Sequence, residues 1–126
     1  MKVCEILDIA FGMAGERLDD FPDKRLPLIW LNVTVAEAVK TENMIRGRKG
    51  VEGMQFTHLL TDMDQEIDMD KELCSTCLPA GVAAFLYSDR GNDYLSAQYR
   101  NRYLDGLQNA AMGCEESIYD YYGGGM

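Results

Sequence analysis

Two cysteines three residues apart, Cys74 and Cys77, form the pair whose type and spacing most directly suggest chemistry. On a helix, residues at i and i+3 share a face, so the two thiols are neighbours. A structural zinc site needs four ligands, and a thioredoxin-type site places its pair after a strand. The single histidine, His58, is far away in the sequence, and an acidic stretch precedes the pair. We interpret both thiols as small buried helix residues and predict neither a metal site nor a redox site.

Carboxylates alternate along residues 62–72, DMDQEIDMDKE, as they do at the start of a calcium-binding loop. An EF-hand requires glycine at its sixth position and glutamate at its twelfth. Those positions hold Ile67 and Leu73, so the run is better explained by helix capping and a solvated loop. The glycine-containing stretches match neither a P-loop nor a dinucleotide fingerprint, and His58 has no nucleophile signature around it. The sequence therefore predicts no catalytic residue, no cofactor and no metal, and indicates that the chain is not an enzyme.

The composition is that of an ordinary soluble domain, with 126 residues, 47% hydrophobic and 26% charged. No apolar stretch reaches the roughly 20 residues that a membrane helix needs. The N-terminal apolar stretch contains Glu5 and Asp8, which argues against a signal peptide. We expect a protein in the cytoplasm of its cell, with no membrane partner and with four free thiols.

A net charge of −9 argues against nucleic-acid binding as the main activity, because such binding depends on Lys and Arg neutralising phosphates. The basic cluster Arg46, Arg48 and Lys49 lies among glycines and is interpreted as a solvated loop. An acidic surface has a different use, since DNA passes it without sticking.

The apolar spacing predicts a mostly all-α fold with four helices and a single domain at 1–114. The expected helices are 2–18, 24–41, 69–88 with Asp68 as N-cap, and 93–112 with Asn92 as N-cap. The last two should pack as an antiparallel hairpin, because the break between them is short. The helix at 24–41 is apolar on two sides, which indicates a central helix or a second contact surface.

Two parts of the chain lack a helical pattern. Residues 45–66 are expected to be irregular, because Gly47, Gly50 and Gly53 should break any helix, and MQFTHLL favours a short strand or β-hairpin at 54–60. The Tyr/Gly-rich end, residues 115–126, is expected to be a flexible tail. Residues 42–66 and the tail at 115–126 are candidates to become ordered only on contact with neighbouring subunits.

Residues 66–108 resemble the small α-helical head–tail connector (head-completion adaptor) proteins of tailed phages and prophages. In that family a helix enters a Leu-Pro-x-Gly-hydrophobic-Ala turn, a short polar break follows, and then an Ala/Tyr-rich helix. The matching residues of this chain are Leu78, Pro79, Gly81, Ala83, Ala97, Tyr99 and Tyr103. The segment 26–39, LPLIWLNVTVAEAV, is similar to the family's second helix.

The resemblance implies a virion structural protein that forms a ring on the portal and continues the DNA channel into the tail. Its partners would be further copies of itself and the portal and tail proteins, and its final location the virion. Such a role needs contact surfaces that are heterologous so that a ring can close. The alternative is a small non-catalytic helical protein-interaction or regulatory module.

Overall fold

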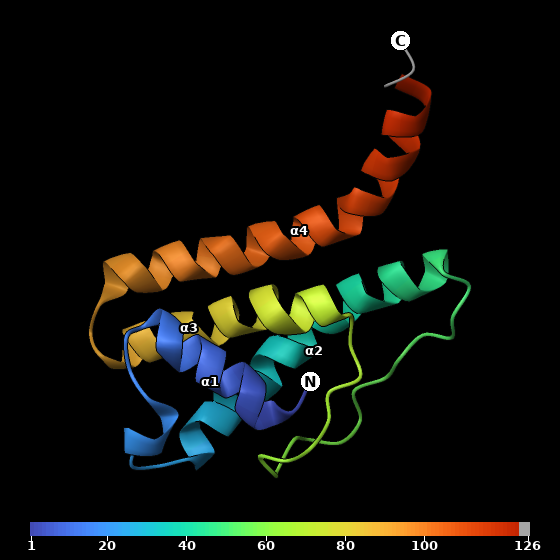
Figure 1. Cartoon of the computed structure of the whole chain (residues 1–126). Coiled ribbons are helices and arrows are strands. Elements are labelled where there is room, and N and C mark those ends of the chain that lie inside the picture. The colour runs from blue at the N-terminus through green and yellow to red at the C-terminus, as the bar shows by residue number, and fades with distance from the viewer. Residues whose placement is uncertain (124–126) are drawn as a thin grey trace.

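The computed structural model describes the backbone of residues 1–123 and the side chains of residues 1–112. In that part of the chain four α-helices carry the fold and no β-strand is present. The helices are α1 (Val3–Met13), α2 (Arg25–Arg48), α3 (Leu78–Asp89) and α4 (Asp93–Gly123), with a 3-10 turn at Leu18–Asp20 and a π-helical turn at Leu73–Cys77 (Figure 1). The all-α prediction is confirmed. The division into a domain at 1–114 and a flexible tail at 115–126 stays a prediction, because the side chains of that tail lie outside the described part.

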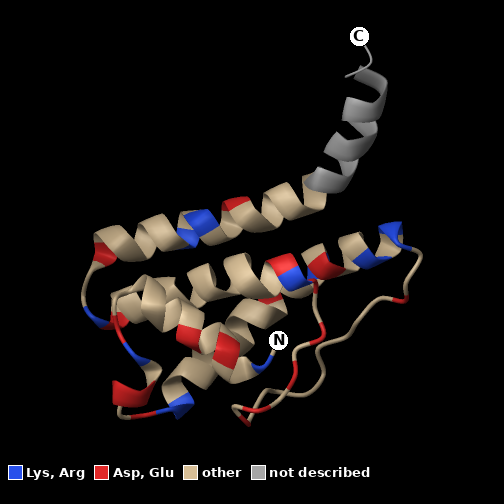
Figure 2. Ribbon diagram, in the orientation of Figure 1, with Lys and Arg blue, Asp and Glu red and all other residues tan. Residues whose placement is uncertain are grey.

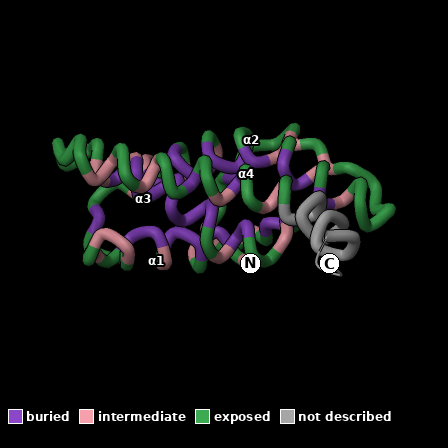
Figure 3. The backbone as a smooth tube through the Cα atoms, turned by 90° about the horizontal axis from the view of Figure 1, so that it is seen from above, coloured by how far each residue is buried: buried purple, intermediate pink, exposed green. Residues whose placement is uncertain are grey.

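The central helix is α3, against which α1, α2 and α4 all pack. Its residues from Leu78 to Ala84 are all buried, as the purple stretch of Figure 3 shows. It carries no charge before Asp89 (Figure 2), because a helix buried on every side has no face for charged residues. The sequence suggested the helix at 24–41 as one candidate for this place; α2 instead has an exposed side.

The chain turns sharply after α3 and α4 runs back along it (Figure 1). Asn92 caps α4 as predicted, its Oδ1 accepting from the Leu95 amide at 3.1 Å. Farther along, the Ser96 hydroxyl donates to the Ala84 carbonyl across the two helices at 2.7 Å. The predicted antiparallel hairpin is confirmed.

Glycines outside the helices set two boundaries that differ from the predicted ones. α1 stops at Met13, and Gly15 adopts a φ of 70° in a Schellman cap, so the predicted helix at 2–18 was too long. α2 continues through Gly47 to Arg48 and ends in the same way at Gly50, with a φ of 68°. The prediction that Gly47 breaks the helix was wrong, because a single glycine inside a helix costs only about 1 kcal/mol.

Four aromatic rings join α1, α2 and α3 into one core. Phe21 meets Phe11 edge to face at 5.4 Å between centroids and Trp30 at 5.8 Å. Trp30 stacks on Phe85 of α3, with centroids 6.3 Å apart and planes 6° apart. Such pairs stabilise by about 0.5–1.5 kcal/mol beyond the area they bury.

The connecting segment, residues 51–70, runs back along α2 without forming a strand. Two asparagines on one face of α2 hold it. The Asn43 side chain accepts from the Met54 amide at 2.7 Å and donates to its carbonyl at 3.1 Å. Asn32 does the same for Leu60, at 2.7 and 3.0 Å. The predicted strand or hairpin at 54–60 is wrong, because side-chain amides replace a partner strand.

Candidate functional site

The cysteine pair lies in the π-helical turn, and both thiols are buried and free. Burial raises the pKa of Cys74 and of Cys77, which opposes formation of a reactive thiolate. His58 is exposed on the connecting segment. Within the described residues, no group of three or more His, Cys, Asp or Glu side chains is arranged to hold a metal ion. The pair therefore contributes packing to this part of the fold.

The π-helical turn explains how Pro79 enters a helical stretch. A proline has no amide hydrogen, and its ring clashes with the carbonyl four residues earlier in an α-helix. Here the backbone widens immediately before it, and the Leu78 amide reaches the Leu73 carbonyl five residues back. The N-cap is Asp70, whose Oδ2 accepts from the Glu72 amide at 3.1 Å, and not the predicted Asp68, whose place is two residues earlier.

The residues that carry the family resemblance lie along the interface between α3 and α4. Four of them, Leu78, Pro79, Gly81 and Ala83, are buried in α3. On α4, Tyr103 is fully buried, Tyr99 is half-buried and Ala97 is exposed. The other six motif residues are buried or half-buried and pack within the fold. Ala97 is exposed, so packing does not require it to be small.

Gly81 lies where α2, α3 and α4 approach one another closely. A methyl group on its Cα would lie 2.7 Å from Cγ2 of Thr34 and 3.1 Å from a ring carbon of Tyr103. The Tyr103 hydroxyl donates to the Thr34 carbonyl at 2.8 Å, and burial raises the pKa of that hydroxyl. Small size at Gly81 is thus a requirement of the fold.

Beside this junction an open groove of about 450 Å³ separates α2 from α4. Small and apolar residues of α3 form its floor, with α2 on one wall and α4 on the other. Its apolar lining comprises Val33, Gly81, Ala84, Phe85 and Ala97. The volume is in the range of sites that hold a ligand or an inserted side chain.

An ion pair links the two walls of the groove. Arg100 of α4 donates to both carboxylate oxygens of Glu37 on α2, at 2.9 and 2.6 Å. These hydrogen bonds lower the pKa of Glu37. A bidentate pair of this kind fixes the spacing of the walls more strongly than a single contact does.

One face of α4 is exposed and carries no charge. We call it the α4 outer face, and it consists of Tyr94, Ala97, Asn101, Leu104, Gln108 and Met112. Tyr94 is 72% exposed and Leu104 44% exposed. On α2, Ile29 and Val33 are also exposed, at 55% and 43%. Both helices thus leave apolar side chains exposed, and such side chains are typical of protein contact surfaces where they form a contiguous patch.

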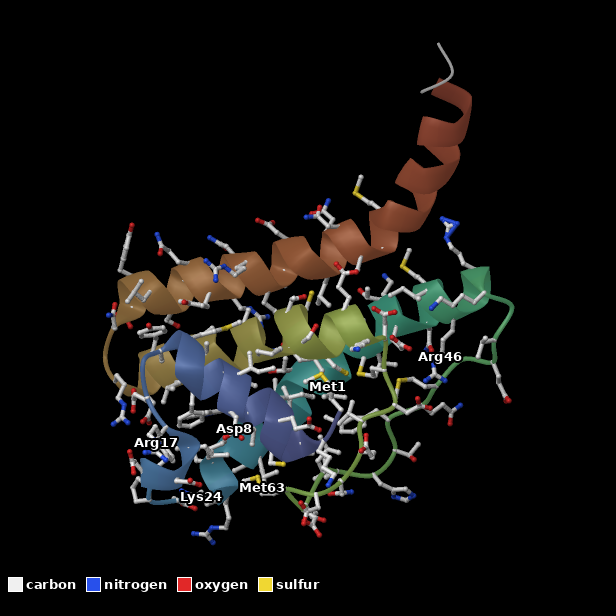
Figure 4. All side chains as sticks on the ribbon, in the orientation of Figure 1. Met1, Asp8, Arg17, Lys24, Arg46 and Met63 are labelled. Atoms are coloured by element: carbon white, nitrogen blue, oxygen red, sulfur yellow. The ribbon has the colours of Figure 1, made fainter. Side chains whose placement is uncertain are left out.

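Two of the three residues in the predicted basic cluster, Arg46 and Lys49, make contacts within the fold. Arg46, labelled in Figure 4, points from α2 toward the connecting segment and donates to Glu42 at 3.0 Å and to the Asp68 carbonyl at 2.6 Å. Lys49 lies 3.9 Å from Asp70. The interpretation of the cluster as a solvated loop was wrong, because Arg46 and Arg48 lie in α2 and because Arg46 and Lys49 attach the connecting segment to the helix.

Comparison with protein-family models, with characterised proteins and with solved structures gave no match to this chain. None of the helices in the described part combines the length and the apolar character needed to cross a membrane.

Proposed function

We propose that this chain is a non-catalytic assembly subunit, a head–tail connector protein that forms a ring on the portal of a tailed phage or prophage particle. The observation that carries the proposal is the pairing of an apolar groove with an uncharged, exposed α4 outer face on a strongly acidic chain. The groove and the α4 outer face differ in shape and meet at Ala97, which belongs to both. Different surfaces on one subunit suit heterologous association, which closes into a ring when the rotation per subunit allows it.

The charge fits the same role. A ring of subunits with a net charge of −9 each presents an acidic wall, past which DNA slides because like charges repel. The same charge opposes assembly at low salt, so a contact surface with little net charge lowers the repulsion between neighbours. The α4 outer face has this property along its whole described length.

The test is assembly on a portal. Purified chain is mixed with the portal protein encoded beside its gene, across a salt series, and examined by light scattering and electron microscopy. We expect rings on the portal, favoured by added salt. Leu104→Asp should weaken assembly, because it places a charge on the α4 outer face, whereas Gln55→Asp, on the exposed connecting segment, should not.

Two results would overturn the proposal. One is a gene neighbourhood that encodes no portal, capsid or tail protein. The other is a chain that stays monomeric at high concentration with and without the portal, which would favour the regulatory-module alternative.

A further inference from the structure

We propose that two copies of this chain pair through their α4 outer faces, side by side and in the same direction, as a short parallel coiled coil. The inference goes beyond the proposed function, because it concerns the chain before it meets a portal. A two-fold pair uses the same face of both copies and cannot extend into a ring, so it has to open before that face joins one. All the residues that carry the inference lie at 93–112, where the structure describes the side chains.

The α4 outer face has the residue spacing of a coiled-coil seam. From Tyr94 to Gln108 its five residues follow one another in steps of three, four, three and four, which is the spacing of positions a and d in a heptad. All five are exposed. The residues of α4 that contact the core, Tyr99, Tyr103 and Leu107, recur every four positions on another side of the helix. The helix therefore carries two stripes, and its own chain covers one of them.

An asparagine occupies an a position in the middle of this seam. In a parallel two-stranded coiled coil, one asparagine at position a fixes the register and the number of strands at some cost in stability. It does so because it lies opposite its counterpart, and each side-chain amide can donate to the other and accept from it. Asn101 has this place, with Ala97 and Leu104 at the d positions on either side. Only pairing in the same direction and in register brings each a residue opposite its own counterpart.

The charges beside the seam complement one another in the same direction. Arg100 occupies position g, and Asp105 occupies position e of the next heptad. In a parallel pair a g residue lies beside the e residue five positions further along the other helix, so each Arg100 meets the Asp105 of the other copy. Arg100 already donates twice to Glu37, but a guanidinium has five N–H donors, and this side chain is 38% exposed. An antiparallel pair sets g against g and e against e, and does not join these two residues.

The acidity of the chain opposes association least along α4. Residues 93–112 contain two aspartates and two arginines, which sum to zero, whereas the whole chain has a net charge of −9 (Figure 2). Two heptads are short for an isolated coiled coil, whose helices must form as they pair. Here α4 is already held in its helix by packing on α3, so pairing has no helix to nucleate.

Analytical ultracentrifugation of the full chain tests the contact, with a monomer–dimer equilibrium as the expected result. Asp105→Arg should raise the dimer Kd roughly tenfold, because Arg100 then faces a like charge on both sides of the seam. Asp8→Arg is its control, since it makes the same change of charge at an exposed position of α1 and should not raise the Kd. Asn101→Leu should lower the Kd and allow species larger than dimers. A monomer at every concentration, or an unchanged Kd for either α4 variant, overturns the inference.

Disulfide cross-linking tests the direction of the pair. The background replaces Cys4 and Cys114 with Ser, and copper–phenanthroline is the oxidant. Tyr94→Cys and Gln108→Cys should each cross-link to a second copy of itself, because like positions meet in a parallel pair. Asn109→Cys is the control, exposed on α4 and off the seam, and should not cross-link. Cross-linking of neither seam variant to itself, or of the control equally well, shows the parallel pair to be wrong.

The inference and the proposed function fail separately. If the chain is monomeric at every concentration but forms rings on the portal, the pairing is wrong and the connector role stands. If the chain pairs as expected but never joins a portal, the pairing stands and the connector role fails.

Discussion

The packing of Gly106 against Cys77 allows a quantitative test of how α4 meets the π-helical turn. A methyl group added at Gly106 would lie 2.7 Å from the Cys77 sulfur. Cys77 is 5% exposed, so its side chain has little room to move away. The Gly106→Ala substitution therefore forces either the thiol or α4 to shift.

Two effects of opposite sign set the magnitude. Replacing a helical glycine by alanine stabilises by about 0.5–1 kcal/mol where space is free. Overpacking a buried contact costs about 1–3 kcal/mol. We expect Gly106→Ala to destabilise the chain by roughly 0.5–2 kcal/mol. In a Cys77→Ala background the obstructing sulfur is gone, so the same change should stabilise by about 0.5–1 kcal/mol.

Urea unfolding of the two single variants and the double variant measures this coupling, with an expected interaction energy of about 1–3 kcal/mol. Gly47→Ala is the control, because nothing lies within 4 Å of a methyl group there, and its effect should not depend on Cys77. Strictly additive effects of Gly106→Ala and Cys77→Ala would refute this account of the contact.

Three further substitutions test other parts of the structure. Tyr103→Phe removes a buried hydroxyl that donates a hydrogen bond and should cost about 1 kcal/mol in urea unfolding; an unchanged midpoint would contradict this. Asn43→Ala should speed hydrogen exchange of the Met54 amide, which it otherwise holds at 2.7 Å, and equal protection would show that the amide is held by something else. Glu37→Gln should cost less than about 1 kcal/mol at neutral pH, since the pair with Arg100 is partly exposed. Because the pKa of Glu37 is lowered from 4.5 in the folded chain, its stabilisation is present above that pH and is lost as the pH falls. The difference in stability between the variant and the unmodified chain should therefore shrink as the pH falls below 4.5, and a gap of constant size would contradict this.

The sequence predicted the helices well because their apolar residues recur every three or four positions. Asn92 and the polar break beside it were enough to place the α3–α4 hairpin. Helix ends were predicted poorly at Gly15 and Gly50, since the glycine that stops a helix lies outside it and looks like any other glycine. Gly47 is the opposite case, because it lies inside α2 and does not end the helix.

The connecting segment shows a limit of a different kind. Asn32 and Asn43 are 11 residues apart, which is three helical turns, so both lie on one face of α2. That spacing was visible in the sequence, but its use depends on a chain that returns 28 residues after Asn32. Hydrogen bonds from helix side chains to the backbone of an extended segment impose no periodic pattern on the segment's own sequence. The β-capable residues at 54–60 therefore predicted a strand that does not form.

The groove was not predictable, since residues from three helices line it. Its one sequence signal was the small size of Gly81 and Ala97, both of which belong to the motif that resembles the connector family. The motif predicts a packing role for both positions. The structure separates them, because Gly81 is enclosed and Ala97 is exposed.

This separation allows fold and function to be tested independently. At Gly81 a larger side chain meets Thr34 and Tyr103, so Gly81→Ala should lower the free energy of unfolding by about 1–3 kcal/mol whether or not the groove is used. At Ala97 no such contact restricts the side chain, so Ala97→Phe should leave the stability within about 0.5 kcal/mol of the unmodified chain. If association then falls while stability does not, the small residue at Ala97 keeps the groove open for a neighbour. Equal losses at both positions would mean that the groove is only a by-product of close helix packing.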